Sequence, residues 1–174
     1  GIASPACLPD VVGVGATGEG DEVDSCGSAE AIVRTIPAYL KDEQVSALAN
    51  AGITADWSIQ PGRWSLLAGT EGGLAMQRVL HAMGVDLDGL TALDAAALDS
   101  PQSRVRVEGI GTDAVHLRNI GDGVTPGELW RAVVEATTEE VTKLHNSMTD
   151  IVGQHQEIIV TGGWSHSAAL MAAK

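Results

Sequence analysis

The sequence has no phenylalanine, a single tyrosine and only two cysteines, Cys7 and Cys26, among its 174 residues. Two cysteines form neither a metal-ligand spacing nor a disulfide framework, so both are expected to be small core residues. Because aromatic side chains are so few, no stacking platform for nucleic-acid bases is expected. The chain shows no apolar run long enough to cross a bilayer and no basic and then apolar leader, so a cytoplasmic location is expected.

Positive charge is scarce as well. Ten Lys and Arg residues stand against 23 Asp and Glu residues, which gives a formal net charge of −13 at pH 7. Such a chain is repelled by nucleic-acid phosphates and by anionic membranes, so neither is an expected partner. An anionic ligand would have to be held by main-chain N–H groups together with a divalent metal. The five histidines show no paired spacing typical of a metal site, and no residue is assigned as a metal ligand.

What the chain does contain is a series of short apolar segments bounded by glycine, in a protein of one-domain size. Asp42 is predicted to cap the first helix, and Thr125 with Glu128 is predicted to form a capping box on the longest helix. The four tryptophans are the expected large anchors of the core. Apolar periodicity predicts strands at 22–26, 31–36, 53–67 (two strands), 104–107 and 157–161. It predicts helices at 42–52, 72–84, 91–100 and 125–153, and a final short helix that runs to the C-terminus. Residues 109–123 are predicted to be a loop.

The pair Gly162-Gly163 lies between a β-branched run, Glu157–Thr161, and a Ser/Ala/Leu segment that is predicted to be a short helix. Glycines at a strand-to-helix turn tolerate positive φ and let a ligand approach the main chain. The N–H groups at the start of the following helix favour an anion or polar ligand atoms. Most such turns only redirect the chain, so a packing role is the alternative.

Two further glycine turns have a similar placement. Gly27-Ser28 joins two predicted strands as a hairpin and can direct N–H groups and a hydroxyl toward a phosphate. Gly72-Gly73 opens a predicted helix. At both turns a plain turn or a packing role explains the glycines as well as a ligand does. A GxGxxG match at residues 13–18 is interpreted as accidental, because no helix is predicted to begin there.

Taken in order, the turns Asp24–Glu30, Gly72–Gln77 and Gly162–Ser167 resemble the C-terminal domain of the FGGY carbohydrate kinases, the family of glycerol kinase and xylulokinase. The first is similar to the family's D-S-x-G-T/S-x-E phosphate turn. The second is similar to its glycine followed four residues later by Gln, and the third to its near-terminal strand-Gly-Gly adenosine motif. Leu129–Glu135 is similar to the R-A-V-x-E segment of the family's long helix. The resemblance covers nearly the whole chain.

The resemblance implies an α/β fold, namely an actin-like ATPase (ribonuclease H-like) domain with a mixed sheet flanked by helices. It implies that residues 1–174 are the C-terminal nucleotide-binding domain of a sugar kinase. This domain would bind ATP and Mg²⁺ in a cleft against an N-terminal sugar-binding domain that is absent from this chain. Carried over by position, the ATP-binding residues would be Gly27 and Ser28 at the terminal phosphates, Gly73 at an inner phosphate, Gln77 at the nucleoside, and Gly162, Gly163 and Ser167 at the adenosine.

The chain departs from the family at the catalytic base. The family's general-base Asp aligns with Ala6, and the nearby Asp10 is out of register, so no catalytic residue is assigned. The abrupt join Cys7-Leu8 leads to the hypothesis that a loop of the real polypeptide is missing there. A normal peptide bond at that join would instead favour a catalytically dead fragment.

The expected function is therefore ATP-dependent phosphorylation of a sugar or polyol hydroxyl by the full enzyme, in which an Asp accepts the hydroxyl proton and Mg²⁺ with N–H groups stabilises the γ-phosphoryl. The sugar or polyol would be held mainly by the missing N-terminal domain, so the chain alone is expected to be inactive. A homodimer is retained as an expected assembly. Two alternatives stay open: a non-catalytic actin-fold nucleotide-binding module, and a protein whose glycine turns only pack.

Overall fold

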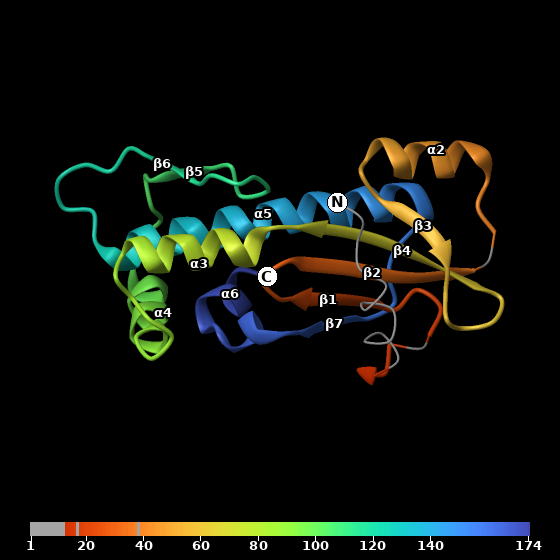
Figure 1. Ribbon diagram of the computed structural model, residues 1–174, viewed down its shortest axis with the longest axis horizontal. Helices are drawn as coiled ribbons and strands as arrows, with labels where there is room; N and C mark the ends of the chain where they lie inside the picture. Colours follow the sequence, from red (N-terminus) through yellow and green to blue (C-terminus); the bar gives the residue numbers. More distant parts are fainter. Residues whose placement is uncertain (1–12, 17, 38) are drawn as a thin grey trace. The chain divides into compact units, whose positions relative to one another are not determined.

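A computed structural model describes residues 13–16, 18–37 and 39–174, and these divide into two compact units. We call the first the sheet unit; it contains the described residues up to Cys26, together with 30–69 and 141–162. We call the second the helix unit; it contains residues 27–29, 70–140 and 163–174. Figure 1 labels the elements of both units. The two units are described separately below.

The sheet unit is built on five strands in the order β3-β4-β2-β1-β7. The strands β1 and β2 pair antiparallel, as do β3 and β4, whereas β1 and β7 pair parallel. The sheet is therefore mixed, and β3 and β7 are its edges. All five strands overlap segments that the apolar pattern predicted, but β2 is one residue longer at each end and β4 continues three residues beyond the predicted segment. Their bounds are β1 (Glu22–Cys26), β2 (Glu30–Pro37), β3 (Thr54–Trp57), β4 (Arg63–Thr70) and β7 (Ile158–Thr161).

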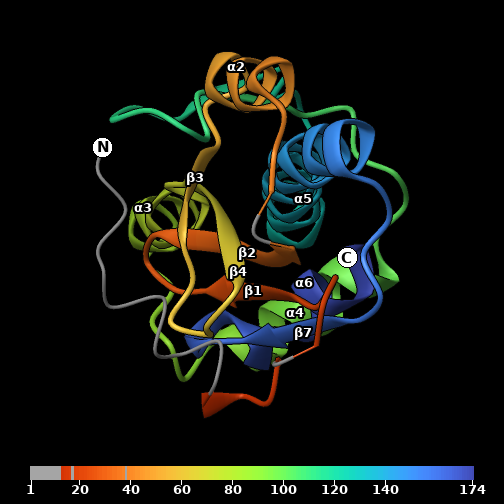
Figure 2. The ribbon, with the colours of Figure 1, turned by 90° about the vertical axis from the view of Figure 1, so that its right-hand side faces the viewer.

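Successive side chains of each strand point to opposite faces of the sheet, and each face carries an apolar layer. One face is covered by α2 (Asp42–Asn50) and by the second half of α5 (Pro126–Val152), both drawn on the same side of the sheet in Figure 2. Val23 and Val33 point to the other face, where Ile159 packs against them. This separation follows from the period of two along a strand. The buried core under the helices consists of Ile32, Ile36, Leu48, Ile53, Leu66, Ala68, Val141 and Met148.

The helix unit contains most of the remaining helices and a small antiparallel hairpin. The hairpin differs from the prediction, because a strand, β6, lies inside the expected loop at 109–123 and pairs with β5, which begins two residues later than expected. A diagonal ion pair connects the two strands, with 2.9 Å between Arg118 Nε and Glu108 Oε2, and such a polar contact leaves no apolar periodicity in the sequence. The elements are α3 (Gly72–Ala82), α4 (Leu90–Asp99), β5 (Arg106–Glu108), β6 (His116–Arg118), the first half of α5, the 3₁₀ turn η1 (Gly163–His166) and α6 (Ala168–Ala173).

The helix caps were predicted with mixed success. The capping box of α5 is confirmed: Glu128 N donates to Thr125 Oγ1 at 3.2 Å, and Thr125 N donates to Glu128 Oε2 at 2.9 Å. The predicted cap at Asp42 is wrong. Lys41 holds the N-cap position, and Asp42 lies in the first turn, where its negative charge suits the helix dipole.

Within the described part of the chain, no helix has the length and apolar character needed to cross a membrane.

The tryptophans are not all core anchors. Trp130 is fully buried, as predicted, but Trp57 is 66% exposed. Trp57 lies on the edge strand β3, where its ring packs edge-on against Trp64 with 5.5 Å between ring centroids. A side chain on an edge strand has a neighbouring strand on one side only, so position in the sheet, rather than residue type, sets this exposure.

Candidate functional site

Gly162 is required by the packing of the sheet unit. The parallel strands β1 and β7 are in register at Ser25 and Thr161, so the C-terminal ends of both strands lie side by side. A Cβ on Gly162 would lie 2.6 Å from the carbonyl oxygen of Cys26, and the φ of Gly162 is +95°. Only glycine takes this conformation readily and tolerates so close an approach. For Gly162 the packing alternative is therefore sufficient without a ligand.

Within the helix unit, the first two glycine turns predicted from the sequence are brought together. Leu74 N donates to the carbonyl oxygen of Ser28 at 2.8 Å, so the turn at residues 27–29 lies against the first turn of α3. A Cβ on Gly73 would lie 1.9 Å from the carbonyl oxygen of Gly27. The glycine at position 73 thus permits a backbone-to-backbone contact that no other residue could make. The contact joins Gly27, Ser28 and Gly73 into one local structure.

The side chains beside this contact face outward. Ser28 is exposed, and its hydroxyl makes no hydrogen bond within the described residues. Gln77 is also exposed and lies four residues after Gly73, which places both on the same side of α3 one turn apart. A hydroxyl, a carboxamide and the main chain of a glycine turn are the groups that bind polar ligands without charged side chains. The geometry therefore leaves the side chains of Ser28 and Gln77 available to a ligand, whereas Gly73 is itself buried against the turn at residues 27–29.

Gly163 differs from Gly73 and Gly162. It is exposed, its φ lies outside the left-handed region, and a Cβ built on it would meet no atom within 4 Å. Neither backbone conformation nor packing in the described structure requires a glycine there. Gly121 shares both properties, so they leave the main chain of η1 open to a ligand without requiring one.

Ser167 lies inside the helix unit. It is 1% exposed, and its hydroxyl accepts from Leu170 N at 3.2 Å as the N-cap of α6. The same hydroxyl donates to Asp94 Oδ1 at 3.0 Å. The helix expected directly after the glycine pair is thus split into η1 and α6, with Ser167 between them. Both hydrogen bonds of the Ser167 hydroxyl lie inside the helix unit, so Ser167 would act in a site through the position of this turn.

The sheet unit contains a buried cluster of acidic and thiol groups to which the sequence analysis assigned no metal. Asp24, Cys26 and Glu30 form the one group of three among the described residues whose potential metal-ligand atoms lie within 4.8 Å of one another. The Cys26 thiol lies 3.6 Å from Asp24 Oδ1 and 3.5 Å from Glu30 Oε1. Cys26 is buried, as predicted. A thiol does not suit Mg²⁺, which takes oxygen ligands, so this donor set as a whole does not fit that ion.

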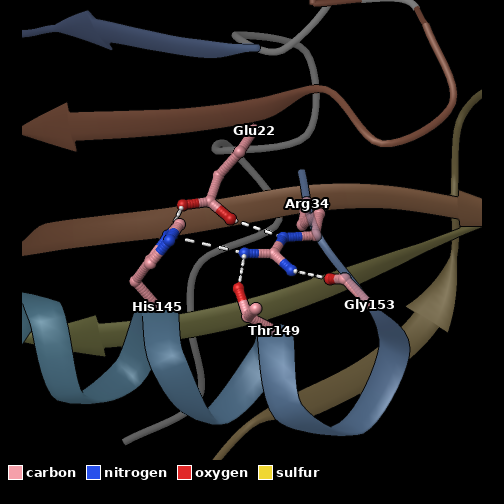
Figure 3. A network of polar contacts seen from close by, with 5 residues as sticks. All are labelled: Glu22, Arg34, His145, Thr149 and Gly153. Atoms are coloured by element: carbon pink, nitrogen blue, oxygen red, sulfur yellow. Dashed lines mark hydrogen bonds and ion pairs between the residues drawn. The ribbon is translucent and has the colours of Figure 1, made fainter. Parts of the chain in front are cut away.

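A second polar group in the sheet unit is a buried ion-pair network (Figure 3). Glu22 and Arg34 are direct cross-strand partners on β1 and β2, and Arg34 Nε donates to Glu22 Oε2 at 2.5 Å. Arg34 also donates to the Gly153 carbonyl at 2.8 Å and to Thr149 Oγ1 at 3.1 Å, and His145 Nδ1 lies 2.7 Å from Glu22 Oε1. The network attaches the second half of α5 and the residue after it to two strands. It satisfies its own charges, which makes it structural.

The predicted departure at the catalytic base lies outside the described residues. This concerns Ala6, Asp10 and the join Cys7-Leu8. The structure consequently assigns no general base, and the hypothesis of a missing loop stays a prediction.

Comparison with known proteins was made by sequence and by structure. No protein-family model matches the sequence, and no curated protein sequence matches it. Xylulose kinase from Rhodospirillum rubrum superposes with a TM-score of 0.78 at 19% identity, covering 96% of this chain and 35% of that one. A Plasmodium falciparum glycerol kinase solved with ADP gives 0.74 at 11% identity, covering 95% and 35%, and a Lactobacillus acidophilus gluconate kinase gives 0.69 at 14%, covering 91% and 34%.

The chain has the fold of a carbohydrate-kinase domain. The predicted actin-like ATPase fold, with a mixed sheet flanked by helices, is confirmed. The resemblance to FGGY carbohydrate kinases is thereby confirmed at the level of fold, since identities of 11–19% are too low to carry activity across. The chain spans about a third of the length of these carbohydrate kinases, so a whole kinase's activity is a separate question.

Proposed function

We propose that this chain is the nucleotide-binding domain of a kinase that phosphorylates a hydroxyl of a sugar or polyol with ATP. Its fold supports this, because the matched structures are xylulose, glycerol and gluconate kinases, and the glycerol kinase was solved with ADP. The observation that carries the proposal is the contact of buried Gly73 with the turn at residues 27–29, since it brings the exposed side chain of Ser28 to the first turn of α3, one turn before the exposed side chain of Gln77.

The nucleotide would be held mainly by main chain. In this proposal the turn of Gly27 and Ser28 contacts the terminal phosphates, Gly73 an inner phosphate, and Gln77 the nucleoside. N–H groups at turns bind polyphosphate without Lys or Arg, which reconciles ATP binding with a net charge of −13. When bound, ATP supplies the phosphoryl group and Mg²⁺ neutralises its charge.

The third turn would contact the adenosine through Gly163. Gly163 is the member of the predicted set whose lack of a side chain has no internal explanation in the described structure. Gly162 supports the turn by packing on Cys26, and Ser167 supports it as the cap of α6. The proposal thus keeps all predicted residues but gives Gly162 and Ser167 indirect roles.

The chemistry requires parts that this chain does not supply. We propose that the N-terminal domain of the longer polypeptide holds the sugar or polyol, and that a general base outside the described residues accepts the proton of the attacked hydroxyl. This chain alone is then inactive. Phosphorylation of any sugar or polyol by residues 1–174, above a heat-treated control, would contradict that part of the proposal.

Titration calorimetry with Mg-ADP on the full-length polypeptide tests the binding step. We expect saturable heat, and its absence would leave the packing alternative for all three turns. A coupled assay over ketoses, aldoses and polyols tests the transfer step. Saturable ADP binding without turnover of any of these acceptors would favour the non-catalytic module instead.

A further inference from the structure

Asp94 is a buried carboxylate of α4 that the proposed function does not use. It is 3% exposed, and both oxygens accept hydrogen bonds from other elements of the helix unit. Trp130 Nε1 on α5 donates to Oδ1 at 2.7 Å, and the Ser167 hydroxyl donates to the same oxygen at 3.0 Å. Ala168 N donates to Oδ2 at 2.7 Å. A buried carboxylate is stable only when paired or hydrogen-bonded, so these three donors account for its position.

The contacts of Asp94 form part of a closed ring around η1. Trp164, the second residue of η1, packs against Trp130 with 6.2 Å between ring centroids. Ser167 N donates to the Trp164 carbonyl at 2.9 Å, and Ser167 returns to Asp94 through its hydroxyl. The 3₁₀ turn is thus held at its start by the two indoles and at its end by the carboxylate. Gly163 is the first residue of this turn.

We propose that Asp94 is a positioning residue for nucleotide binding, which acts by fixing the η1–α6 turn so that the main chain at Gly163 is presented in one conformation. This inference rests on the proposed function, in which Gly163 contacts the adenosine. A turn that must be ordered on binding costs affinity, whereas a turn already held in place does not. Asp94 would not touch the ligand. Its effect would be confined to ligands that reach the third turn.

The test compares Asp94→Asn with Asp99→Asn in the full-length polypeptide. Asparagine at 94 keeps an oxygen for Trp130 and Ser167 but turns an amide N–H₂ toward the N–H of Ala168, so a donor faces a donor. Asp99 is an exposed residue at the end of the same helix and provides the matched control. Mg-ADP is titrated calorimetrically, and inorganic tripolyphosphate, which has no adenosine, is measured by competition with ADP.

We expect Asp94→Asn to raise the Kd for ADP about 5- to 10-fold, by loss of preorganisation, and to change the Kd for tripolyphosphate less than about 2-fold. Asp99→Asn should change neither. Because Asp94 and Ser167 act through one contact, adding Ser167→Ala to Asp94→Asn should weaken ADP binding less than the product of the two single effects. If Asp94→Asn does not fold, Ser167→Ala alone must show the same selective loss for ADP.

Three results would overturn the inference. Unchanged ADP binding in the folded variant would remove the positioning role. An equal loss for ADP and tripolyphosphate would show a general structural role instead. Absence of ADP binding by the unmodified protein would refute the proposed function, and this inference with it. If the unmodified protein binds ADP and Asp94→Asn binds it equally well, only the positioning role is refuted.

Discussion

The substitution Gly163→Ala tests whether the glycine at this position is required for ligand binding or for folding. A Cβ at Gly163 meets no atom within 4 Å, and its φ is outside the left-handed region, so alanine fits the described structure without strain. Replacing glycine with alanine at a compatible position stabilises a protein by about 0.4–1 kcal/mol, because the unfolded chain loses conformational freedom. For a protein of this size or larger, that corresponds to a Tm that is unchanged or raised by at most about 4 °C.

The effect on a nucleotide should have the opposite sign. If adenosine packs against the main chain of Gly163, the new methyl group takes space that the ligand occupies. Inserting a methyl group into a close-packed contact costs about 1–3 kcal/mol. By the relation between affinity and free energy, this is a rise of roughly 5- to 150-fold in the Kd for Mg-ADP. Stability and affinity should therefore change in opposite directions.

Gly121 provides the matched control. It is also exposed, its φ is also outside the left-handed region, and a Cβ on it meets nothing within 4 Å, but it lies in the loop before α5 and in none of the three turns. Gly121→Ala should leave the Kd for ADP unchanged. Calorimetric titration gives the affinities and differential scanning fluorimetry gives Tm. If Gly163→Ala binds ADP as tightly as Gly121→Ala does, the third turn is not part of a nucleotide site.

Three further predictions concern stability and can be read from thermal unfolding. Gly73→Ala should cost about 3 kcal/mol, the upper end for overpacking, because the Cβ would meet the rigid carbonyl of Gly27; a Tm within 2 °C of the parent would contradict this. Glu22→Gln should destabilise the protein by about 3–5 kcal/mol, since it leaves the buried Arg34 without its counter-charge, and adding Arg34→Met should recover much of the loss; a double variant no more stable than the single one speaks against it. Thr125→Ala should cost about 1 kcal/mol by removing the cap of α5, and no measurable change in Tm would show that the capping box is dispensable.

The sequence determined the element order because most elements have an apolar face with the period of a strand or a helix. The helices α3 and α5 and the strands β1, β2 and β7 were predictable for this reason, and the capping box at Thr125 marked the start of α5. Exposed polar elements have no such pattern. The strand β6 was missed because its pairing depends on a turn and on polar contacts between chain segments.

The glycine turns show where sequence reasoning about the site had to stop. The resemblance assigned Gly73 to an inner phosphate and Gly162 and Gly163 to the adenosine, so all three were predicted to contact the ligand. Folding made them different: an added Cβ would meet the Gly27 carbonyl at Gly73 and the main chain of Cys26 at Gly162, but would meet no atom within 4 Å at Gly163. Whether a glycine is needed depends on atoms distant in sequence, and no local pattern records them.

By itself, the sequence determined the order of strands and helices, three glycine turns and an acidic composition, since these follow from local periodicity and composition. The α/β fold class was predicted from the resemblance to the FGGY carbohydrate kinases. Only the tertiary structure decided which polar groups are buried together. Asp94 lies in a run of alanine and leucine and meets Ser167 73 positions later, and Glu22 meets His145 123 positions later. The physical reason is that a buried charge is tolerated only where folding brings donors to it, and those donors come from other elements.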